Sequence, residues 1–517
     1  MSAHEGERVL AIDQGTTGTT VLLLDRKGRV TGRGYAELPQ HFPQPGWVEH
    51  DGDEIWDTCV RAIAAALESD PSARVVAIGV TNQRETTLVW DRATSKPIAP
   101  AIVWQDRRTA DRCDALRRAG QERAIARRTG LRLDPYFSGT KLEWILRHSS
   151  GARGCARRGE LAFGTIDAWV LWKLTGGAVH ATDPTNASRT LLYDIHRHRW
   201  DDDLLDLFGV APALLPVVKP SSGEFGRTRG VPGLPDGIPI AGIAGDQQAA
   251  LFGQGCVTAG GLKNTYGTGC FLMLHTGSRA PLPKGGLLAT VACGPRGEAA
   301  YALEGSVFIA GAAVQWLRDG LGIIATAAET EYLARSVPDA GGTYLVPAFA
   351  GLGAPWWRPD ARGLWCGLTR GTTRAHLARA ALEAIAFQTC DVVDAMGAVA
   401  RSKIARMRVD GGATANDFLM QLQADLLGVV VERPQVVETT ALGAAHLAGI
   451  AIGWWDRGGG VPGADGAITM FRPAIARRER DRLRSGWREA VSMLLRAPAA
   501  SRRARPSVSR ASRSRKR

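Results

Sequence analysis

Strand-like and helix-like segments alternate along most of this chain, and this alternation constrains its fold more than any other feature. Apolar runs at residues 8–13, 19–25, 75–81 and 87–91 have the length and composition of strands, and residues 53–68 have a helical pattern. Strands that alternate with helices are typical of α/β domains. We therefore expect an α/β fold.

The alternation runs through a second cycle in the C-terminal part of the chain. Strand-like segments lie at residues 238–243, 262–265, 271–275 and 407–410, and a helical pattern covers residues 376–396. A chain of 517 residues is too long for one hydrophobic core and indicates several domains. We place a hinge in the Gly- and Ala-rich residues 254–262, and predict a first domain over residues 1–254 and a second over 255–495.

The positive charge of the chain is concentrated at its C-terminal end. Its formal net charge is +13, and residues 496–517 hold nine Lys or Arg and no Asp or Glu. Subtracting these nine leaves +4 for residues 1–495. The segment is rich in Ser, Ala, Pro and Arg without an apolar period, so we predict a disordered basic tail. A solvated appendage is favoured over a nucleic-acid-binding arm, and we expect no nucleic-acid partner.

The sequence carries no pattern for export, membrane insertion or disulfide cross-linking. Its start lacks the basic and then long apolar stretch of a secretory signal, and Gly, Pro or His446 interrupts the long uncharged stretches. Eight cysteines are scattered without CxxC spacing, which favours reduced thiols over disulfides or a metal site. We expect a cytoplasmic protein without a membrane span.

A turn rich in Gly and Thr follows the first strand of each half. Residues 11–19 read AIDQGTTGT and residues 263–271 read KNTYGTGCF, and both indicate strand, turn and strand. Glycine lets backbone N–H groups approach a ligand closely, and threonine adds a hydroxyl donor. Two such turns facing each other, with Asp13 at the first, would hold a polyphosphate from opposite sides. Two ordinary hairpins are the alternative.

A cation and a carboxylate stand next to each other after the strand at residues 75–80. Ligands collect at strand ends in α/β sheets. Neighbours in an extended chain point to opposite faces, so Arg84 and Glu85 reach one ligand only if a turn has ended the strand. An Arg donor beside a Glu acceptor suits a polyol, whose hydroxyls both donate and accept. A surface ion pair is the alternative.

Asp246 stands at the end of another apolar strand, directly after a glycine. Phosphoryl transfer needs a carboxylate that orients the accepting hydroxyl, or one that binds magnesium, and Asp246 suits either role. The alternative is a helix N-cap, because residues 247–251 are compatible with a helix.

A pair of glycines, Gly411 and Gly412, follows the strand that ends at Asp410. The backbone of paired glycines can lie against a flat base or sugar, although a plain turn is the alternative. Asn416 is expected to cap a helix over residues 418–427.

Taken in order, six motifs of this sequence resemble the FGGY family of carbohydrate kinases, and most closely its members that phosphorylate glycerol. They read DQGTT at 13–17, NQRETT at 82–87, YFSGTKLEW at 136–144, GDQQAALFG at 245–253, KNTYGTGCF at 263–271 and DGGA at 410–413. The resemblance covers about residues 8–495. Only the basic tail lies outside it.

This resemblance implies an actin-like ATPase fold, in which two ribonuclease H-like domains surround a nucleotide and substrate cleft. The first domain would bind substrate and phosphate, and the second would bind the nucleotide. The implied reaction transfers the γ-phosphoryl group of ATP to glycerol, giving sn-glycerol 3-phosphate and ADP, with Mg²⁺ as cofactor and a role in glycerol catabolism. A homo-oligomer of two or four chains is also implied.

Site residues follow from the resemblance position by position. Those implied for glycerol are Arg84, Glu85, Trp104, Tyr136, Asp246, Gln247 and Phe271. Among them Asp246 would be the catalytic base, and Trp104 and Phe271 would cover the carbon side of glycerol. Asp13 and Asp246 would hold magnesium. Those implied for ATP are Thr16, Thr17, Gly18, Thr268, Gly311, Gln315, Gly412 and Asn416.

The chain also departs from the family pattern. Thr20 replaces an arginine that some relatives carry near the nucleotide, which puts one phosphate contact in question. Residues 234–237 read LPDG where regulated relatives have a Gly-Gly-Thr-Arg loop for fructose 1,6-bisphosphate, so we predict no control by that bisphosphate. A sibling polyol or sugar kinase and an ATP-binding sensor without turnover are the alternative functions. The intact Asp246 argues against the sensor.

Overall fold

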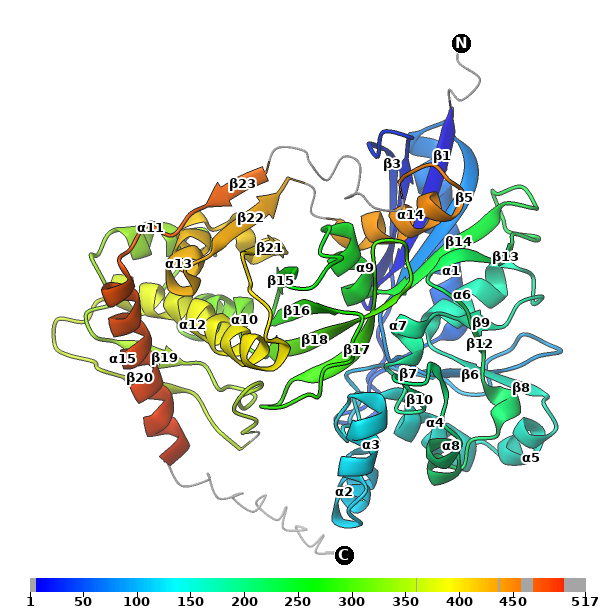
Figure 1. Cartoon of the computed structure of the whole chain (residues 1–517), viewed down its shortest axis with the longest axis horizontal. Helices are drawn as coiled ribbons and strands as arrows, with labels where there is room; N and C mark the ends of the chain where they lie inside the picture. The colour runs from blue at the N-terminus through cyan, green and yellow to red at the C-terminus, as the bar shows by residue number, and fades with distance from the viewer. Residues whose placement is uncertain (1–5, 359, 436–437, 457–467, 497–517) are drawn as a thin grey trace, which may run out of the picture.

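The computed structural model describes residues 6–358, 360–435, 438–456 and 468–496, and Figure 1 shows two large β-sheets side by side in it. The first sheet has the strand order β13-β14-β5-β1-β2-β3. Strands β14, β5 and β1 run parallel, whereas the pairs β13–β14, β1–β2 and β2–β3 are antiparallel. The bounds are β13 (Ser222–Arg227), β14 (Pro239–Gly245), β5 (Arg74–Asn82), β1 (Glu7–Gln14), β2 (Gly18–Leu24) and β3 (Val30–Glu37).

Alternate residues of β1 show why helices cover both faces of this sheet. Leu10 and Ile12 belong to one core with α1 (Gly52–Ser69) and α6 (Ile166–Leu174), while Val9 and Ala11 belong to another with α14 (Thr439–Ala451). Successive side chains of a strand point to opposite faces, so both sets are buried only if both faces are covered. An uninterrupted apolar run is typical of such a strand.

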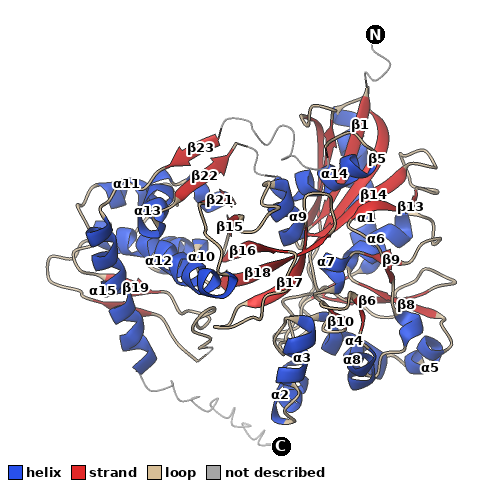
Figure 2. Ribbon diagram, in the orientation of Figure 1, coloured by secondary structure: helices blue, strands red, loops and turns tan. Residues whose placement is uncertain are grey.

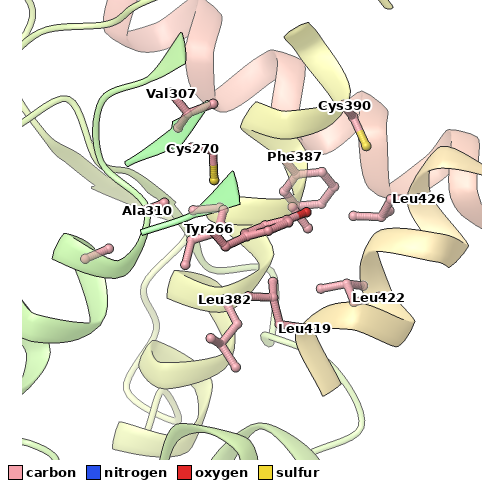
Figure 3. Close-up of a cluster of buried hydrophobic side chains, with 14 of the residues drawn as sticks. Tyr266, Cys270, Val307, Ala310, Leu382, Phe387, Cys390, Leu419, Leu422 and Leu426 are labelled. Atoms are coloured by element: carbon pink, nitrogen blue, oxygen red, sulfur yellow. The ribbon is translucent and has the colours of Figure 1, made fainter. Parts of the chain in front are cut away.

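The second sheet has the strand order β17-β18-β16-β15-β21-β22-β23, seen on the left in Figure 2. Its strands are β17 (Leu288–Cys293), β18 (Ala299–Val307), β16 (Cys270–Gly277), β15 (Leu262–Tyr266), β21 (Arg406–Asp410), β22 (Val430–Pro434) and β23 (Ile468–Phe471). Helices α12 (Arg374–Ala400) and α13 (Asp417–Leu427) pack against it. Figure 3 shows the side chain of Tyr266 among Leu382, Phe387 and Leu419 in their shared core.

Helix α14 comes from the C-terminal half of the chain but packs on the first sheet. Glycines on that sheet allow its close approach, since a Cβ at Gly79 would lie 2.2 Å from the carbonyl oxygen of Ala444, and one at Gly242 would lie 2.5 Å from the amide nitrogen of Ala448. Strand β23 then rejoins the second sheet. The division of the chain after residue 254 stays a prediction. Helix α14 lies in the predicted second domain but packs on the sheet of the first.

The smaller elements join and flank the two sheets. The short strands are β4 (Glu49–His50), β6 (Leu88–Asp91), β7 (Ala101–Ile102), β8 (Leu161–Gly164), β9 (Ala181–Thr182), β10 (Tyr193–Asp194), β11 (Arg199–Trp200), β12 (Val217–Val218), β19 (Tyr344–Val346) and β20 (Leu364–Cys366). The remaining helices are α2 (Ala110–Arg118), α3 (Glu122–Thr129), α4 (Ser138–His148), α5 (Ala152–Arg157), α7 (Pro184–Ala187), α8 (Asp202–Phe208), α9 (Asp246–Gly253), α10 (Gly311–Gln315), α11 (Glu329–Arg335) and α15 (Arg477–Arg496).

Two helix ends test expectations from the sequence. The side chain of Asn416 accepts a hydrogen bond from the backbone N–H of Leu419, so the predicted N-cap of α13 is confirmed. Helix α15 ends at Arg496, the first residue of the segment predicted as a tail, and residues 497–517 lie outside the described part. In the described residues no helix is both long and apolar enough to cross a membrane.

Candidate active site

Three parallel strands of the first sheet end side by side, and predicted substrate residues follow those ends. Gln14 of β1 and Gly245 of β14 both pair with Asn82, the last residue of β5. Arg84 and Asp246 stand just beyond these strands and meet, with 3.0 Å between Arg84 Nε and Asp246 Oδ1. Strand ends of a parallel sheet are where ligands collect in α/β folds.

The side chains of Arg84 and Glu85 are only 2% and 1% exposed. Glu85 has a φ of 59°, in the left-handed region, so a turn has ended the strand as their joint use requires. Arg84 Nε lies 3.9 Å from Glu85 Oε1, so the neighbouring side chains do share one site. The alternative of a surface ion pair is therefore wrong.

Asp246 is the first residue of α9, and the N-cap of that helix is Gly245. The alternative that Asp246 caps the helix is therefore wrong. Its side chain is 32% exposed although its partner Arg84 is almost completely buried. A carboxylate that is held by an arginine and still open to solvent is placed to accept a proton from an incoming hydroxyl.

Asp13 lies close enough to Asp246 for their charges to interact. Burial, together with the charge of Asp246, raises the pKa of Asp13 to about 7. Two carboxylates whose charges interact repel each other, and binding of a divalent cation would relieve that repulsion. The described residues hold no group of three or more His, Cys, Asp or Glu suited to a metal ion. Magnesium in phosphoryl-transfer sites commonly takes one or two carboxylates and completes its ligands with phosphates, and this pair fits that requirement.

Sequence reasoning missed two charged residues of the site, Arg189 and Glu304. Arg189 follows α7, and its Nε donates to Glu85 Oε1 at 2.6 Å while its Nη2 donates to Glu304 Oε1 at 2.9 Å. Arg84 Nη1 donates to Glu304 Oε2 at 2.6 Å. Although burial opposes ionisation, Arg189 and Arg84 lower the pKa of Glu304 to about 2. The only sequence feature that could have indicated Glu304 is that a carboxylate stands inside the apolar segment of residues 299–307.

Aromatic side chains border this charged cluster. Trp104 and Tyr136 pack edge to face, with ring centroids 5.5 Å apart. The indole N–H of Trp104 donates to Thr16 Oγ1 at 2.9 Å, which ties the aromatic pair to the first glycine-rich turn. The guanidinium of Arg189 lies 5.9 Å from the centroid of the Tyr136 ring. The structure thus brings Trp104 and Tyr136 together with Arg84 and Glu85.

One face of the second sheet is turned toward the same cluster. Residues directly opposite in antiparallel pairing share a face, so Lys263, Met273 and Glu304 form one row across β15, β16 and β18. Phe271 lies two residues from Met273 and is on this face as well. Lys263 Nζ donates to Gln247 Oε1 at 2.6 Å, and burial lowers the pKa of this lysine. Lys263, whose role the sequence did not reveal, places Gln247 beside the cluster.

A cavity of about 390 Å³ opens in the second half of the molecule. Five of the residues predicted for ATP line it, namely Thr268, Gly311, Gln315, Gly412 and Asn416. Gly411 has a φ of 91° and packs on Tyr266, while a Cβ added to Gly412 would meet no atom within 4 Å. The paired glycines therefore form both a tight turn and an open wall of the cavity.

The other three residues predicted for ATP, Thr16, Thr17 and Gly18, do not line this cavity. Thr16 and Thr17 lie in the turn between β1 and β2, and Gly18 is the first residue of β2. A 2.9 Å hydrogen bond from Gly15 N–H to the Gly18 carbonyl closes the turn. A Cβ at Gly18 would lie 2.5 Å from the Tyr35 hydroxyl, so this glycine is required for packing against β3. Both glycine-rich turns join antiparallel strands, which confirms the predicted order of strand, turn and strand, and their contact with phosphate stays a prediction.

The two sheets and the nucleotide-sized cavity define the class of the protein, an actin-like ATPase fold of the ribonuclease H-like type. Residues 8–253 match the N-terminal domain of the FGGY family of carbohydrate kinases, and residues 262–452 match its C-terminal domain. This chain belongs to the FGGY family of carbohydrate kinases.

Within this family, the chain is similar to proteins that are named glycerol kinases. The chain is 57% identical to a glycerol kinase of Alkalilimnicola ehrlichii over 94% of its length and 98% of the relative's. It is 58% identical to a glycerol kinase of Trichlorobacter lovleyi, with 93% and 98% covered. Among solved structures, a Plasmodium falciparum glycerol kinase with ADP superposes with a TM-score of 0.91 at 34% identity, covering 95% of this chain and 99% of the other.

Proposed function

We propose that this chain is a glycerol kinase, which transfers the γ-phosphoryl group of ATP to glycerol and forms sn-glycerol 3-phosphate and ADP. The identity of more than half of its residues to glycerol kinases over nearly its whole length supports this substrate. One observation of the structure carries the proposal. A buried arginine and glutamate, an accessible aspartate and an aromatic pair meet at the strand ends of the first sheet.

The residues around Arg84 have the chemistry to bind a small polyol. Arg84 donates hydrogen bonds, Glu85 accepts them, and each hydroxyl of glycerol can do both. Trp104 and Phe271 offer apolar surface to the carbon chain. Because Arg84, Glu85 and Trp104 are held by protein partners, glycerol would meet a site that needs little rearrangement.

Asp246 is the residue we assign as general base. As the chosen hydroxyl oxygen of glycerol attacks the γ-phosphorus, a new O–P bond forms, its proton passes to Asp246, and the bond to the β,γ-bridging oxygen breaks to release ADP. Arg84 holds Asp246 through Oδ1, which fixes the direction in which the carboxylate faces. Phosphoryl transfer depends chiefly on such positioning.

Asp13 and Asp246 are the residues we assign to magnesium. When bound there, Mg²⁺ would neutralise phosphate charge during transfer. The assignment rests on the two carboxylates. Without a cation, burial and the charge of Asp246 raise the pKa of Asp13 to about 7.

The 390 Å³ cavity is the site we assign to the nucleotide, and Gly412 tests it. We expect Gly412→Val to raise KM for ATP about tenfold or more while KM for glycerol changes less than about twofold, because Gly412 lines the cavity and its Cβ would meet no atom within 4 Å, so the methyl groups would take up cavity space. Steady-state kinetics with each substrate varied would measure this. Gly397→Val is the matched control, since a Cβ at Gly397 also meets no atom within 4 Å and the residue does not line the cavity. An unchanged KM for ATP in Gly412→Val would place the nucleotide elsewhere.

The loop after β13 leads us to expect no response to fructose 1,6-bisphosphate. Asp236 Oδ1 accepts a 2.7 Å hydrogen bond from Gly230 N–H, and Arg227 pairs with Glu224 at 2.8 Å. The Gly230 N–H and the Arg227 guanidinium therefore already have protein acceptors, and the Asp236 carboxylate would repel a phosphate. Initial rates at subsaturating glycerol should stay within about 20% when the bisphosphate reaches millimolar concentration. Saturable, strong inhibition would show that the loop still forms a phosphate site.

The substrate is tested by rates of ADP release with a panel of polyols and sugars. We expect kcat/KM for glycerol to exceed that for any pentulose, hexonate or tetritol by at least about 10³, because the buried charged groups would be left unpaired by a poorly fitting ligand. A sibling kinase would show its highest kcat/KM with another compound, and a sensor would show none.

We also propose a reducing, cytoplasmic location and assembly into a homo-oligomer. All eight cysteines are free thiols in the structure, in keeping with a reducing compartment. The oligomer rests on family resemblance.

A further inference from the structure

Glu304 belongs to β18 of the second sheet, yet both hydrogen bonds that its carboxylate accepts from described residues come from the first half of the chain. It accepts from Arg84 through Oε2 and from Arg189 through Oε1. Arg189 in turn donates to Glu85. We propose that Glu304 and Arg189 are positioning residues, which hold Arg84 and Glu85 in the arrangement that binds glycerol. This inference rests on the proposed function and adds the requirement that the second sheet set the affinity for glycerol.

The contacts of Arg84 show how this positioning works. Its Nε faces Asp246 Oδ1 at 3.0 Å, and its Nη1 donates to both Glu304 Oε2 and Gln248 Oε1. No described residue accepts from Nη2, so this is the donor that remains for a ligand. A guanidinium is planar, and fixing two of its nitrogens fixes the direction of the third.

Glu85 is held in a corresponding way by Arg189. Arg189 Nε donates to Oε1 of Glu85, and among the described residues none donates to Oε2. Because Arg189 also reaches Glu304 through Nη2, one planar side chain relates the two carboxylates to each other. A lysine could keep the charge of Arg189 but could not reproduce this fork.

The charges of the four side chains compensate one another. They are Arg84, Arg189, Glu85 and Glu304. Two arginines and two glutamates lie together with at most 2% of each side chain exposed. Removing one charge from such a buried set leaves its partners uncompensated, and they then turn toward new partners or take up water. Loss of Glu304 would therefore disturb Arg84 directly, although Glu304 itself need not touch glycerol.

Kinetics of Glu304→Gln test the inference against a matched control. We expect Glu304→Gln to raise KM for glycerol about 30-fold or more, with KM for ATP changed less than about twofold. Glu432→Gln is the control, because Glu432 is a buried glutamate of the same sheet that also pairs with two arginines, Arg406 and Arg408, outside the substrate cluster. It should leave KM for glycerol within about twofold even if it lowers the melting temperature as much.

Arg189 provides a second and independent test. We expect Arg189→Met to raise KM for glycerol about as much as Glu304→Gln, and Arg189→Lys to recover part of the loss, since it restores the charge without the fork. If either variant is unstable, glycerol binding can be measured by calorimetry at a temperature where its circular dichroism matches the parent. Equal KM values for glycerol in the parent, Glu304→Gln and Arg189→Met would overturn the inference.

The activity of the parent protein with glycerol distinguishes failure of this inference from failure of the proposed function. If the parent does not phosphorylate glycerol, the proposed function is wrong. If the parent does so and the Glu304 and Arg189 variants behave as Glu432→Gln does, only the positioning role is wrong.

Discussion

Replacing Asp246 by Asn is expected to lower kcat by about 10² to 10⁴, the usual loss when a general base is removed. Asparagine keeps an oxygen that can accept from Arg84 Nε, so the side chain should stay in place, but it cannot take the proton of the attacking hydroxyl. Binding of ATP should persist, because the cavity lies in the second half of the molecule. Single-turnover rates and nucleotide binding measured on the same preparation would check both statements.

Asp202→Asn is the control for this substitution. Asp202 is also the first residue of a helix, α8, and lies outside the substrate cluster. It should keep kcat within about twofold. If Asp246→Asn retained more than half of the parent kcat, Asp246 would not be the base.

Replacing Asp13 by Asn is expected to raise the Mg²⁺ concentration for half-maximal activity by about 10- to 100-fold, because one of the two proposed carboxylate ligands is lost. The melting temperature of the metal-free protein is a second readout, which does not depend on activity. A carboxyl group whose folded-state pKa is raised to about 7 destabilises the metal-free fold increasingly as pH rises from about 4 to 7. Asp13→Asn removes that cost, so the metal-free variant should melt higher than the parent at pH 8 and equally at pH 4.

Asp167→Asn is the matched control for the magnesium titration. Asp167 is buried, its pKa is also raised to about 7 by burial and by a neighbouring aspartate, Asp183, and it lies outside the cluster at the strand ends. Its replacement should leave the Mg²⁺ dependence unchanged. A shift as large as that of Asp13→Asn would show that the effect comes from stability and not from a metal ligand.

The sequence was sufficient to predict part of each sheet, namely β1, β2, β5 and β14 of the first sheet and β15, β16 and β21 of the second. The strands β3, β13, β17, β18, β22 and β23 were not predicted. Residues 9–12 form an apolar run, and the structure buries them on two faces because α14 returns to cover the second face. That return was not predictable from local pattern, because α14 is separated from β1 by more than 400 residues and its packing depends on glycines at 79 and 242.

The candidate site was predictable where a motif at a strand end carried it. Arg84, Glu85 and Asp246 follow strands, and their meeting follows from the parallel order of β14, β5 and β1. Arg189 and Glu304 were not found, because an arginine after a short helix and a glutamate inside a strand have no distinctive spacing. Their role follows only from the three-dimensional structure, in which Glu304 of the second sheet accepts hydrogen bonds from Arg84 and Arg189.

The product of the reaction with glycerol tests the account most directly. Incubation of the protein with ATP, Mg²⁺ and glycerol should give sn-glycerol 3-phosphate and ADP in a ratio of about one to one, as the proposed transfer requires. Phosphorus NMR and a stereospecific dehydrogenase assay would measure both products, and omission of glycerol should abolish ADP formation. Formation of ADP without sn-glycerol 3-phosphate, or no turnover with glycerol while another polyol is phosphorylated, would contradict the account.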